Sequence, residues 1–136
     1  MYQSKVEATD IFQALAEKTR LRIMRIMVAH PRAEACLCDM TDSLLEPEHN
    51  VSRHLKILRQ VGLLSAYKEG RWVYHQLVNS SHIKPFYKLI AKIPDGEGIF
   101  AADLKRFNQE LSKRAAARCI KDGPRFKGEK AKSGEA

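Results

Sequence analysis

The chain has 136 residues, of which 44% are hydrophobic and 29% charged, as is typical of a single soluble globular domain. Its 24 Lys and Arg exceed its 16 Asp and Glu, and the net charge of +8 favours a polyanionic partner such as nucleic acid. No apolar run approaches the ~20 residues of a membrane-spanning helix, the first residues lack a signal-peptide core, and the cysteines are too few for a disulfide framework. We therefore expect a cytoplasmic protein with free thiols and no membrane association.

The first half of the chain has apolar residues at helical spacing. Pro31 ends one such segment, and Gly62 is suited to capping another at its C-terminus. The predicted helices span residues 6–16, 17 or 18 to 30, 39–45 and 47–61.

After the fourth helix the pattern changes. Residues 64–68 and 71–77 are two β-prone runs, and Glu69-Gly70 between them is typical of a hairpin turn. A fifth helix is predicted over residues 82–93. A sixth helix follows with a clear apolar stripe, made of Phe100, Leu104, Phe107 and Leu111. The predicted fold is mainly α with a small β-hairpin, in the order ααααββαα.

The helices over residues 39–45 and 47–61 form a candidate helix-turn-helix. In the second of them, Val51, Leu55 and Leu58 face one way and indicate a core. The opposite side and the N-terminal end carry residues suited to contacts with bases or phosphates, which are His49, Asn50, Ser52, Arg53, Lys56 and Gln60. Taken alone, this pattern also fits an ordinary amphipathic surface helix with a solvated polar face.

The predicted hairpin favours the DNA-binding interpretation. Lys68 and Arg71 flank its glycine turn. A recognition helix followed by a basic hairpin is the winged-helix arrangement, in which the wing lies along the phosphate backbone.

Four segments, in the same order, resemble the ArsR/SmtB family of metal-responsive repressors. Residues 17–24 are similar to the family's Asp-Pro-Thr-Arg-Leu-Arg-Ile-Leu opening, with Glu-Lys in place of Asp-Pro. Residues 35–40, Ala-Cys-Leu-Cys-Asp-Met, resemble its Leu-Cys-Val-Cys-Asp-Leu inducer motif. Residues 51–58 and 69–74 match its recognition helix and wing.

The resemblance implies a homodimeric winged helix-turn-helix repressor that binds an operator DNA with an inverted repeat and needs no cofactor to do so. The first helix and the helices after the wing would form the subunit contact, and His54 joins the DNA-contacting candidates through the matched recognition motif. The apolar stripe of the sixth helix agrees with a dimer, although packing of that stripe within one chain is the alternative. Residues 1–120 are then the DNA-binding and dimerisation domain, and residues 121–136, basic and without apolar anchors, a disordered tail.

Cys36 and Cys38 lie just before and at the start of the predicted short helix. Side chains at positions i and i+2 of an α-helix point about 200° apart, so a ligand that needs both sulfurs is expected to unwind the helix start. A helix N-terminus favours thiolate formation, and thiolates select soft ions. In the resembled family this motif binds the inducer, which we expect to be As(III) or Sb(III).

The arsenite sensors of the family commonly carry a third cysteine at the position of Thr41. Cys119 is the remaining candidate for a third thiolate, the alternative being an incidental residue of the tail. The family's zinc site on the dimer helix is expected to be absent, because His82 stands alone there and Asp103 has no histidine partner.

Two rival functions use the same thiols. A repressor of the same fold can sense oxidants or persulfides by pairing Cys36 or Cys38 with Cys119. A thiol enzyme or metalloid carrier would have no role for the recognition helix and wing. No phosphate loop, nucleophile–base pair or cofactor fingerprint supports catalysis.

Overall fold

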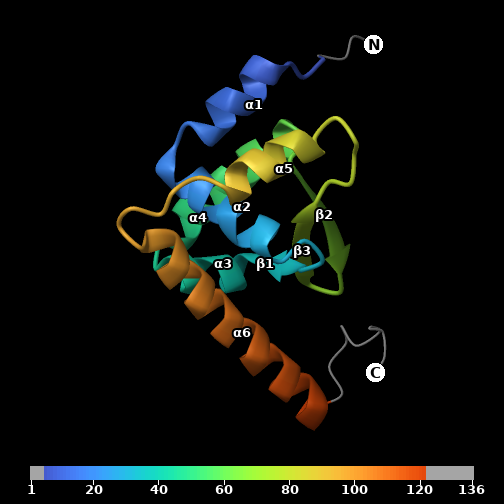
Figure 1. The fold of residues 1–136 in the computed structure, drawn as a ribbon. Helices are drawn as coiled ribbons and strands as arrows, with labels where there is room; N and C mark the ends of the chain where they lie inside the picture. Colours follow the sequence, from blue (N-terminus) through green and yellow to red (C-terminus); the bar gives the residue numbers. More distant parts are fainter. Residues whose placement is uncertain (1–4, 122–136) are drawn as a thin grey trace.

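The structure is a computed structural model that describes residues 5–121 and, of their side chains, those of residues 5–114. Six helices and a small sheet make up the fold (Figure 1). The elements in chain order are α1 (Ala8–Leu15), α2 (Lys18–Ala29), β1 (Ala35–Cys36), α3 (Leu37–Leu44), α4 (Glu48–Gln60), β2 (Leu64–Glu69), β3 (Trp72–Leu77), α5 (Lys84–Ala91) and α6 (Ile99–Lys121). The predicted winged-helix order is confirmed, with one strand added. Among the described residues, no helix is long and apolar enough to span a membrane.

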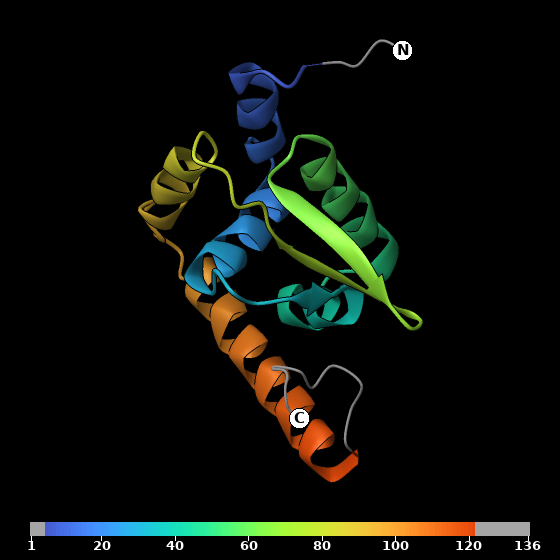
Figure 2. The same ribbon diagram turned by 90° about the vertical axis from the view of Figure 1, so that its right-hand side faces the viewer.

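The added strand, β1, joins the predicted hairpin into an antiparallel sheet of order β1-β3-β2. Gly70, with a φ of 62°, makes the turn of the hairpin, a backbone conformation that suits glycine. Cys36 pairs with Tyr74 of β3, and Ala35 pairs with His75. Figure 2 shows β1 at the edge of the sheet, next to α3. The sheet therefore places the thiol segment beside the wing.

The hydrophobic core forms around α2, which contacts α3, α4, α5 and α6. Four side chains on the buried side of this helix are at most 1% exposed, namely Ile23, Met24, Ile26 and Met27. Val51, Leu55 and Leu58 of α4 lie in the same core, as the apolar spacing predicted. The recognition helix is thus fixed by packing on one side, which leaves its other side to solvent.

The apolar stripe of α6 packs largely within the chain. Phe107 is fully buried in the core, where its ring contacts that of His30, and Leu111 packs against the same cluster. Phe100 lies beneath the guanidinium of Arg25, 4.8 Å from its ring centroid. The stripe therefore has an intrachain explanation and does not by itself require a second subunit.

A buried ionic cluster joins α6 to the end of α3. The fully buried Asp103 carboxylate accepts two hydrogen bonds of 2.8 Å from Arg22 and one of 2.9 Å from Arg106. Arg22 also donates to the Leu44 carbonyl, and Arg106 donates to that of Ser43. The hydrogen bond with Asp103 raises the pKa of Arg22 despite its burial. This cluster fixes the last turn of α3, from which the chain leads into α4.

Candidate DNA-binding surface and thiol site

The turn between α3 and α4 sets the direction of the recognition helix. Leu45 ends α3 in the left-handed conformation, with a φ of 57°, and its backbone N–H donates to the Thr41 carbonyl. Pro47 then takes the N-cap position of α4, where its missing N–H costs nothing. At the N-terminal end of α4 the polar residues Glu48 and His49 are exposed.

Most of the predicted DNA contacts are exposed at the protein surface. The exposed members are His49, Ser52, Arg53 and Lys56 on α4 and Lys68 and Arg71 at the wing. Asn50 is half-buried: it accepts a 2.7 Å hydrogen bond from Arg53 and donates one of 3.2 Å to Glu46. Arg53 is thereby oriented before any DNA is bound.

His54 does not share this surface. It is only 5% exposed, its Nδ1 lies 3.0 Å from Arg20, and its Nε2 lies 3.7 Å from Glu17. Burial lowers its pKa, which favours the neutral ring. Its helical spacing with Val51 and Leu58 was the signal that placed it on the buried side. The assignment of His54 as a DNA contact is therefore not supported by its position.

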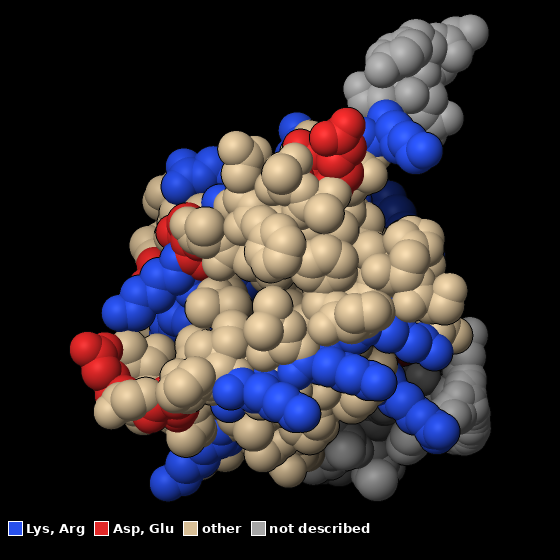
Figure 3. Space-filling model, turned by 45° about the horizontal axis from the view of Figure 1, so that its top comes forward, with Lys and Arg blue, Asp and Glu red and all other residues tan. Residues whose placement is uncertain are grey.

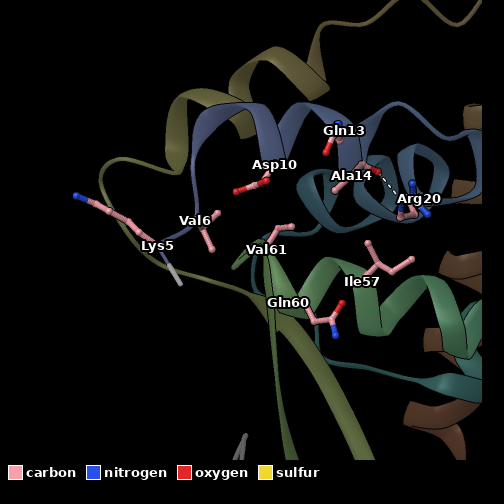
Figure 4. A pocket seen from close by; sticks show the side chains of 9 residues that line it. All are labelled: Lys5, Val6, Asp10, Gln13, Ala14, Arg20, Ile57, Gln60 and Val61. Atoms are coloured by element: carbon pink, nitrogen blue, oxygen red, sulfur yellow. Dashed lines mark hydrogen bonds between the residues drawn. The ribbon is translucent and has the colours of Figure 1, made fainter. Parts of the chain in front are cut away.

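Gln60 is exposed but lies in the last turn of α4, far from its N-terminal end. It lines a cavity of about 460 Å³ between α1 and α4, shown in Figure 4. The facing wall comes from α1, including Asp10 and Gln13, and Arg20 closes one side by donating to the Ala14 carbonyl. Gln60 thus lines the cavity beside α1 and lies apart from the DNA candidates at the N-terminal end of α4.

The two thiols of Cys36 and Cys38 already lie together. Their sulfur atoms are 2.6 Å apart, with Cys36 buried and Cys38 exposed. Cys36 is the N-cap of α3, with extended backbone angles of −85° and 171°, and Cys38 lies in the first helical turn. The expectation that a ligand has to unwind the helix start is therefore wrong, because only one of the two cysteines is helical.

Cys36 occupies a position that serine or threonine usually fills. The Asp39 carboxylate accepts a 3.0 Å hydrogen bond from the Cys36 backbone N–H, and the two side chains form the reciprocal pair of a capping box. Burial, the hydrogen bond with Cys38 and the charge of Asp39 raise the pKa of Cys36 to about 12. For this cysteine the predicted favouring of thiolate by the helix end is wrong, since burial outweighs it.

Asp39 links the thiol segment to α6. Its carboxylate forms a 2.5 Å ion pair with Arg114, which also donates to the Glu34 carbonyl and lies over the ring of Tyr74. Among the described residues, one group of three could hold a metal ion, and it consists of Cys36, Cys38 and Asp39. Their ligating atoms all lie within 4.8 Å of one another. The Cys-x-x-Asp spacing of a capping box was the sequence signal for the role of Asp39.

A cavity of about 520 Å³ is lined both by the thiol pair and by two of the predicted DNA contacts. Cys36, Cys38 and Leu37 form one wall, α4 contributes Ser52 and Leu55, and the sheet closes the other side. The full lining is Cys36, Leu37, Cys38, Glu48, Ser52, Leu55, Arg59, Ala66, Arg71, Trp72, Val73 and His75. Ser52 and Arg71 thus belong both to the cavity and to the predicted DNA contacts.

Arg59 and His75 were not predicted from the sequence to belong to this site. Arg59 donates a 2.7 Å hydrogen bond to Nε2 of His75 across the cavity wall. Burial and the charge of Arg59 lower the pKa of His75 to about 4, so the ring is neutral at physiological pH. His75 reaches this site through its place in β3, opposite Ala35, and Arg59 reaches it through its place on α4.

The other residues considered for a metal site are Cys119, Thr41, Asp103 and His82. The backbone of Cys119 falls within α6, but its side chain lies outside the described residues, as does the predicted tail from residue 122 onward. The Thr41 hydroxyl donates to the Leu37 carbonyl within α3. Asp103 pairs with arginines, and His82 contacts Ser80, so neither takes part in a metal-ligating group among the residues described.

Comparison with known proteins finds relatives that share the helix-turn-helix region of this chain. Residues 17–66 match the model of the bacterial regulatory protein, arsR family. The chain is 32% identical over 87 residues to an HTH-type transcriptional regulator of Methanocaldococcus jannaschii, covering 64% of this chain and 94% of that protein. It is 40% identical over 74 residues to the arsenical resistance operon repressor of Escherichia coli, covering 54% of this chain and 60% of the repressor.

Among solved structures, HlyU from Vibrio cholerae superposes with a TM-score of 0.54 at 26% identity, covering 61% of this chain and 86% of that one. The chain therefore spans nearly the whole archaeal regulator but less than two thirds of the Escherichia coli repressor. The match to the arsR family model, over residues 17–66, contains the helix-turn-helix described above.

Proposed function

Since this chain belongs to the arsR family of DNA-binding transcriptional regulators, we propose that it is a homodimeric repressor that releases its operator when Cys36 and Cys38 bind trivalent arsenic or antimony. The names of several relatives support the inducer class, among them the arsenical resistance operon repressors of Escherichia coli and Bacillus subtilis. Two sulfur ligands suit soft metalloids better than they suit hard, oxygen-seeking ions.

One observation carries the proposal: the thiol pair and the DNA-binding surface share the walls of a single cavity. Ser52 of the recognition helix and Arg71 of the wing line the same space as the two sulfur atoms. A ligand bound to the sulfurs enters this space and displaces side chains that otherwise face DNA. Binding of inducer and binding of operator are then coupled through direct contacts over a short distance.

The exposed apolar residues of α1 and α5 support the homodimer. Phe12 and Leu89 are 52% and 50% exposed, and the ring of Phe12 contacts that of Phe86 edge-on at 5.3 Å. Figure 3, which brings the top of Figure 1 forward, shows an area without charged side chains, bordered by Lys and Arg below and by some Asp and Glu above and at the left. Apolar side chains clustered in this way are typical of a protein–protein contact. We place the subunit contact there, rather than on the stripe of α6.

A titration of DNA release tests the proposed function. Labelled DNA from the chain's own promoter is bound to the protein and then exposed to As(III), Sb(III), methylated As(III), Cd(II), Zn(II) or peroxide. We expect release by the trivalent metalloids at lower concentrations than by Cd(II) or Zn(II). Stable binding throughout the metalloid series would contradict the proposal.

Substituting Arg53 or Lys56 by alanine is expected to weaken operator binding without changing metalloid binding. Both side chains are exposed on α4, and neither lines the cavity that contains the thiols. Loss of a base contact costs about 1–3 kcal/mol, whereas loss of a phosphate contact weakens binding to all sequences and reduces the salt slope by ~1. Gel shifts over a salt series separate the two roles. Wild-type affinity in both variants would remove these residues from the interface.

Substituting Cys119 by serine tests the third thiolate. We propose that Cys119, from the same chain or the partner, completes the coordination of inorganic As(III) or Sb(III), which prefer three sulfurs. The variant is expected to need more arsenite for release but to keep its response to a methylated trivalent arsenical, which needs two. X-ray absorption of the wild-type complex should count three sulfurs at about 2.3 Å, by analogy with zinc–thiolate bonds. A count of two with normal arsenite response would make Cys119 a bystander.

A second candidate, a repressor that senses oxidants or persulfides through the same thiols, is favoured by the 2.6 Å separation of the sulfur atoms. Peroxide would oxidise two thiols to a disulfide and be reduced to two waters. The peroxide arm of the titration distinguishes this function, because release would then occur without metalloid and be reversed by a dithiol reductant.

A further inference from the structure

We infer that the cavity beside Cys36 and Cys38 accommodates the organic group of a trivalent mono-organoarsenical, a compound R–As(OH)₂ in which R is a methyl or an aryl group. This inference rests on the proposed function and makes its ligand class more specific. It follows from the number of sulfurs, their spacing and the walls of the cavity.

The valence of arsenic matches the number of sulfurs in the described site. In R–As(OH)₂ one bond of arsenic goes to carbon and two go to oxygen. Each thiol forms one As–S bond and breaks one As–O bond, and its proton leaves with the hydroxide as water. Arsenic stays trivalent, and no electron acceptor is needed. The burial that keeps a proton on Cys36 is no obstacle, because the departing hydroxide takes that proton.

The spacing of the sulfurs needs only a small adjustment. Two sulfurs bound to one centre at about 2.3 Å, with bond angles between right-angled and tetrahedral, lie roughly 3.3–3.8 Å apart. The sulfurs of Cys36 and Cys38 are 2.6 Å apart, so they separate by about an ångström on binding. Because Cys38 is exposed and free to change its side-chain conformation, α3 keeps its backbone and its cap.

The walls of the cavity suit a carbon substituent. Leu37 and Leu55 lie beside the sulfurs, and Ala66, Trp72 and Val73 form the facing wall of the sheet. Trp72 and Val73 are 39% and 42% exposed, so this apolar surface is available for contact. A cavity of about 150 Å³ is enough to hold benzene. The space of about 520 Å³ here admits a phenyl ring with the sulfurs at one end.

Inorganic arsenite fits the same space less well. With two sulfurs bound, its arsenic keeps one hydroxyl group, which would face this apolar wall. The polar residues of the lining, Glu48, Ser52, Arg59, Arg71 and His75, can contact this hydroxyl, but it gains nothing from Leu37, Trp72 or Val73. Inorganic arsenic prefers a third sulfur, which the lining does not supply, whereas an organoarsenical needs only two.

The test compares release of the operator by phenylarsine oxide, methylated As(III) and arsenite. Burial of a phenyl ring should lower the concentration of phenylarsine oxide required about ten- to hundredfold below that of arsenite. The chain has a single tryptophan, and Trp72 lines the cavity. Its fluorescence is therefore expected to change with phenylarsine oxide and much less with arsenite. Both responses should disappear in a variant in which Cys36 and Cys38 are replaced by serine.

A matched pair of variants tests the cavity itself. Ala66→Leu fills the wall opposite the sulfurs and is expected to remove most of the preference for phenylarsine oxide while leaving arsenite release unchanged. Ser65→Leu adds the same side chain to the opposite face of β2, since neighbouring residues of a strand alternate, and should keep the preference. Circular dichroism and thiol titration verify that both variants are folded.

The outcomes separate the two proposals. Equal potency of phenylarsine oxide and arsenite, with no effect of Ala66→Leu, would overturn the inference about the cavity and leave the arsenic-responsive function standing. Failure of every arsenical to release a bound operator would instead overturn the proposed function.

Discussion

Substitution of Cys36 by serine is expected to give a repressor that binds its operator normally and stays bound when trivalent arsenic is added. Serine is among the preferred N-cap residues, so a serine at this position would form, with Asp39, a better capping box than the native cysteine does. The helix, its ion pair with Arg114 and the DNA-binding surface are therefore retained. What is lost is one of two sulfur ligands, and serine supplies no soft thiolate at neutral pH.

Gel-shift titration with arsenite and with phenylarsine oxide checks this result, and thermal unfolding checks the cap. Cys38→Ser should behave in the same way toward inducer without any gain in stability, because Cys38 is not the capping residue. Full inducibility of either variant would make the pair structural. The presence of a cysteine where serine caps better is itself an argument that this position serves ligand binding.

Replacing Asp103 by alanine is expected to lower the free energy of unfolding by about 3–5 kcal/mol, because removing one partner of a buried ion pair leaves the other charges uncompensated. Asp103 is fully buried between Arg22 and Arg106, which also hold the carbonyls of Leu44 and Ser43. Domains of this kind are stable by only about 5–15 kcal/mol. Denaturant unfolding should therefore show a large decrease in the midpoint concentration, and operator binding should weaken as the end of α3 loosens.

Glu46→Ala is the matched control for this prediction. Glu46 pairs with the same arginine, but at 3.5 Å and with its side chain 31% exposed. Exposed or partly exposed ion pairs contribute about 0–1 kcal/mol, so this variant should unfold close to wild type. A similar loss of unfolding free energy in the two variants would show that the ion pairs of Asp103 contribute no more than a surface ion pair and do not anchor α3.

The helices and the hairpin could be predicted from the sequence because each has a strong local period. Val51, Leu55 and Leu58 fixed the buried side of α4, and the glycine turn fixed the wing. Strand β1 could not be found in this way, since two residues carry no period and its pairing with β3 is non-local. The predicted start of α3 was two residues late, and the expectation of helix unwinding came from treating both cysteines as helical, although Cys36 is an extended N-cap residue.

The candidate site was only partly visible in the sequence. Cys36 and Cys38 stood out because of their residue type and their resemblance to a known motif. Arg59 and His75 did not, because they are brought to the cavity by the sheet and the packing of α4. His54 shows the converse error, in which a polar residue type concealed a buried position. Residue types thus indicated the candidate ligands in the sequence. The residues around them could be identified only from burial and long-range pairing in the structure.

Ser52 and Arg71 line the cavity and are also proposed to face DNA, and this has a consequence for how promoters would respond. Coupling between two binding events is reciprocal, so an inducer that weakens operator binding by a given factor is itself bound more weakly by the operator-bound protein, by the same factor. DNA then acts as an antagonist of the inducer. Each tenfold loss of affinity for the inducer corresponds to about 1.4 kcal/mol of binding free energy. If several promoters carried operators of different affinity, the weakest would be released first as arsenic rises and the strongest last. A single sensor would in this way give a graded sequence of responses without any difference in the thiol site itself.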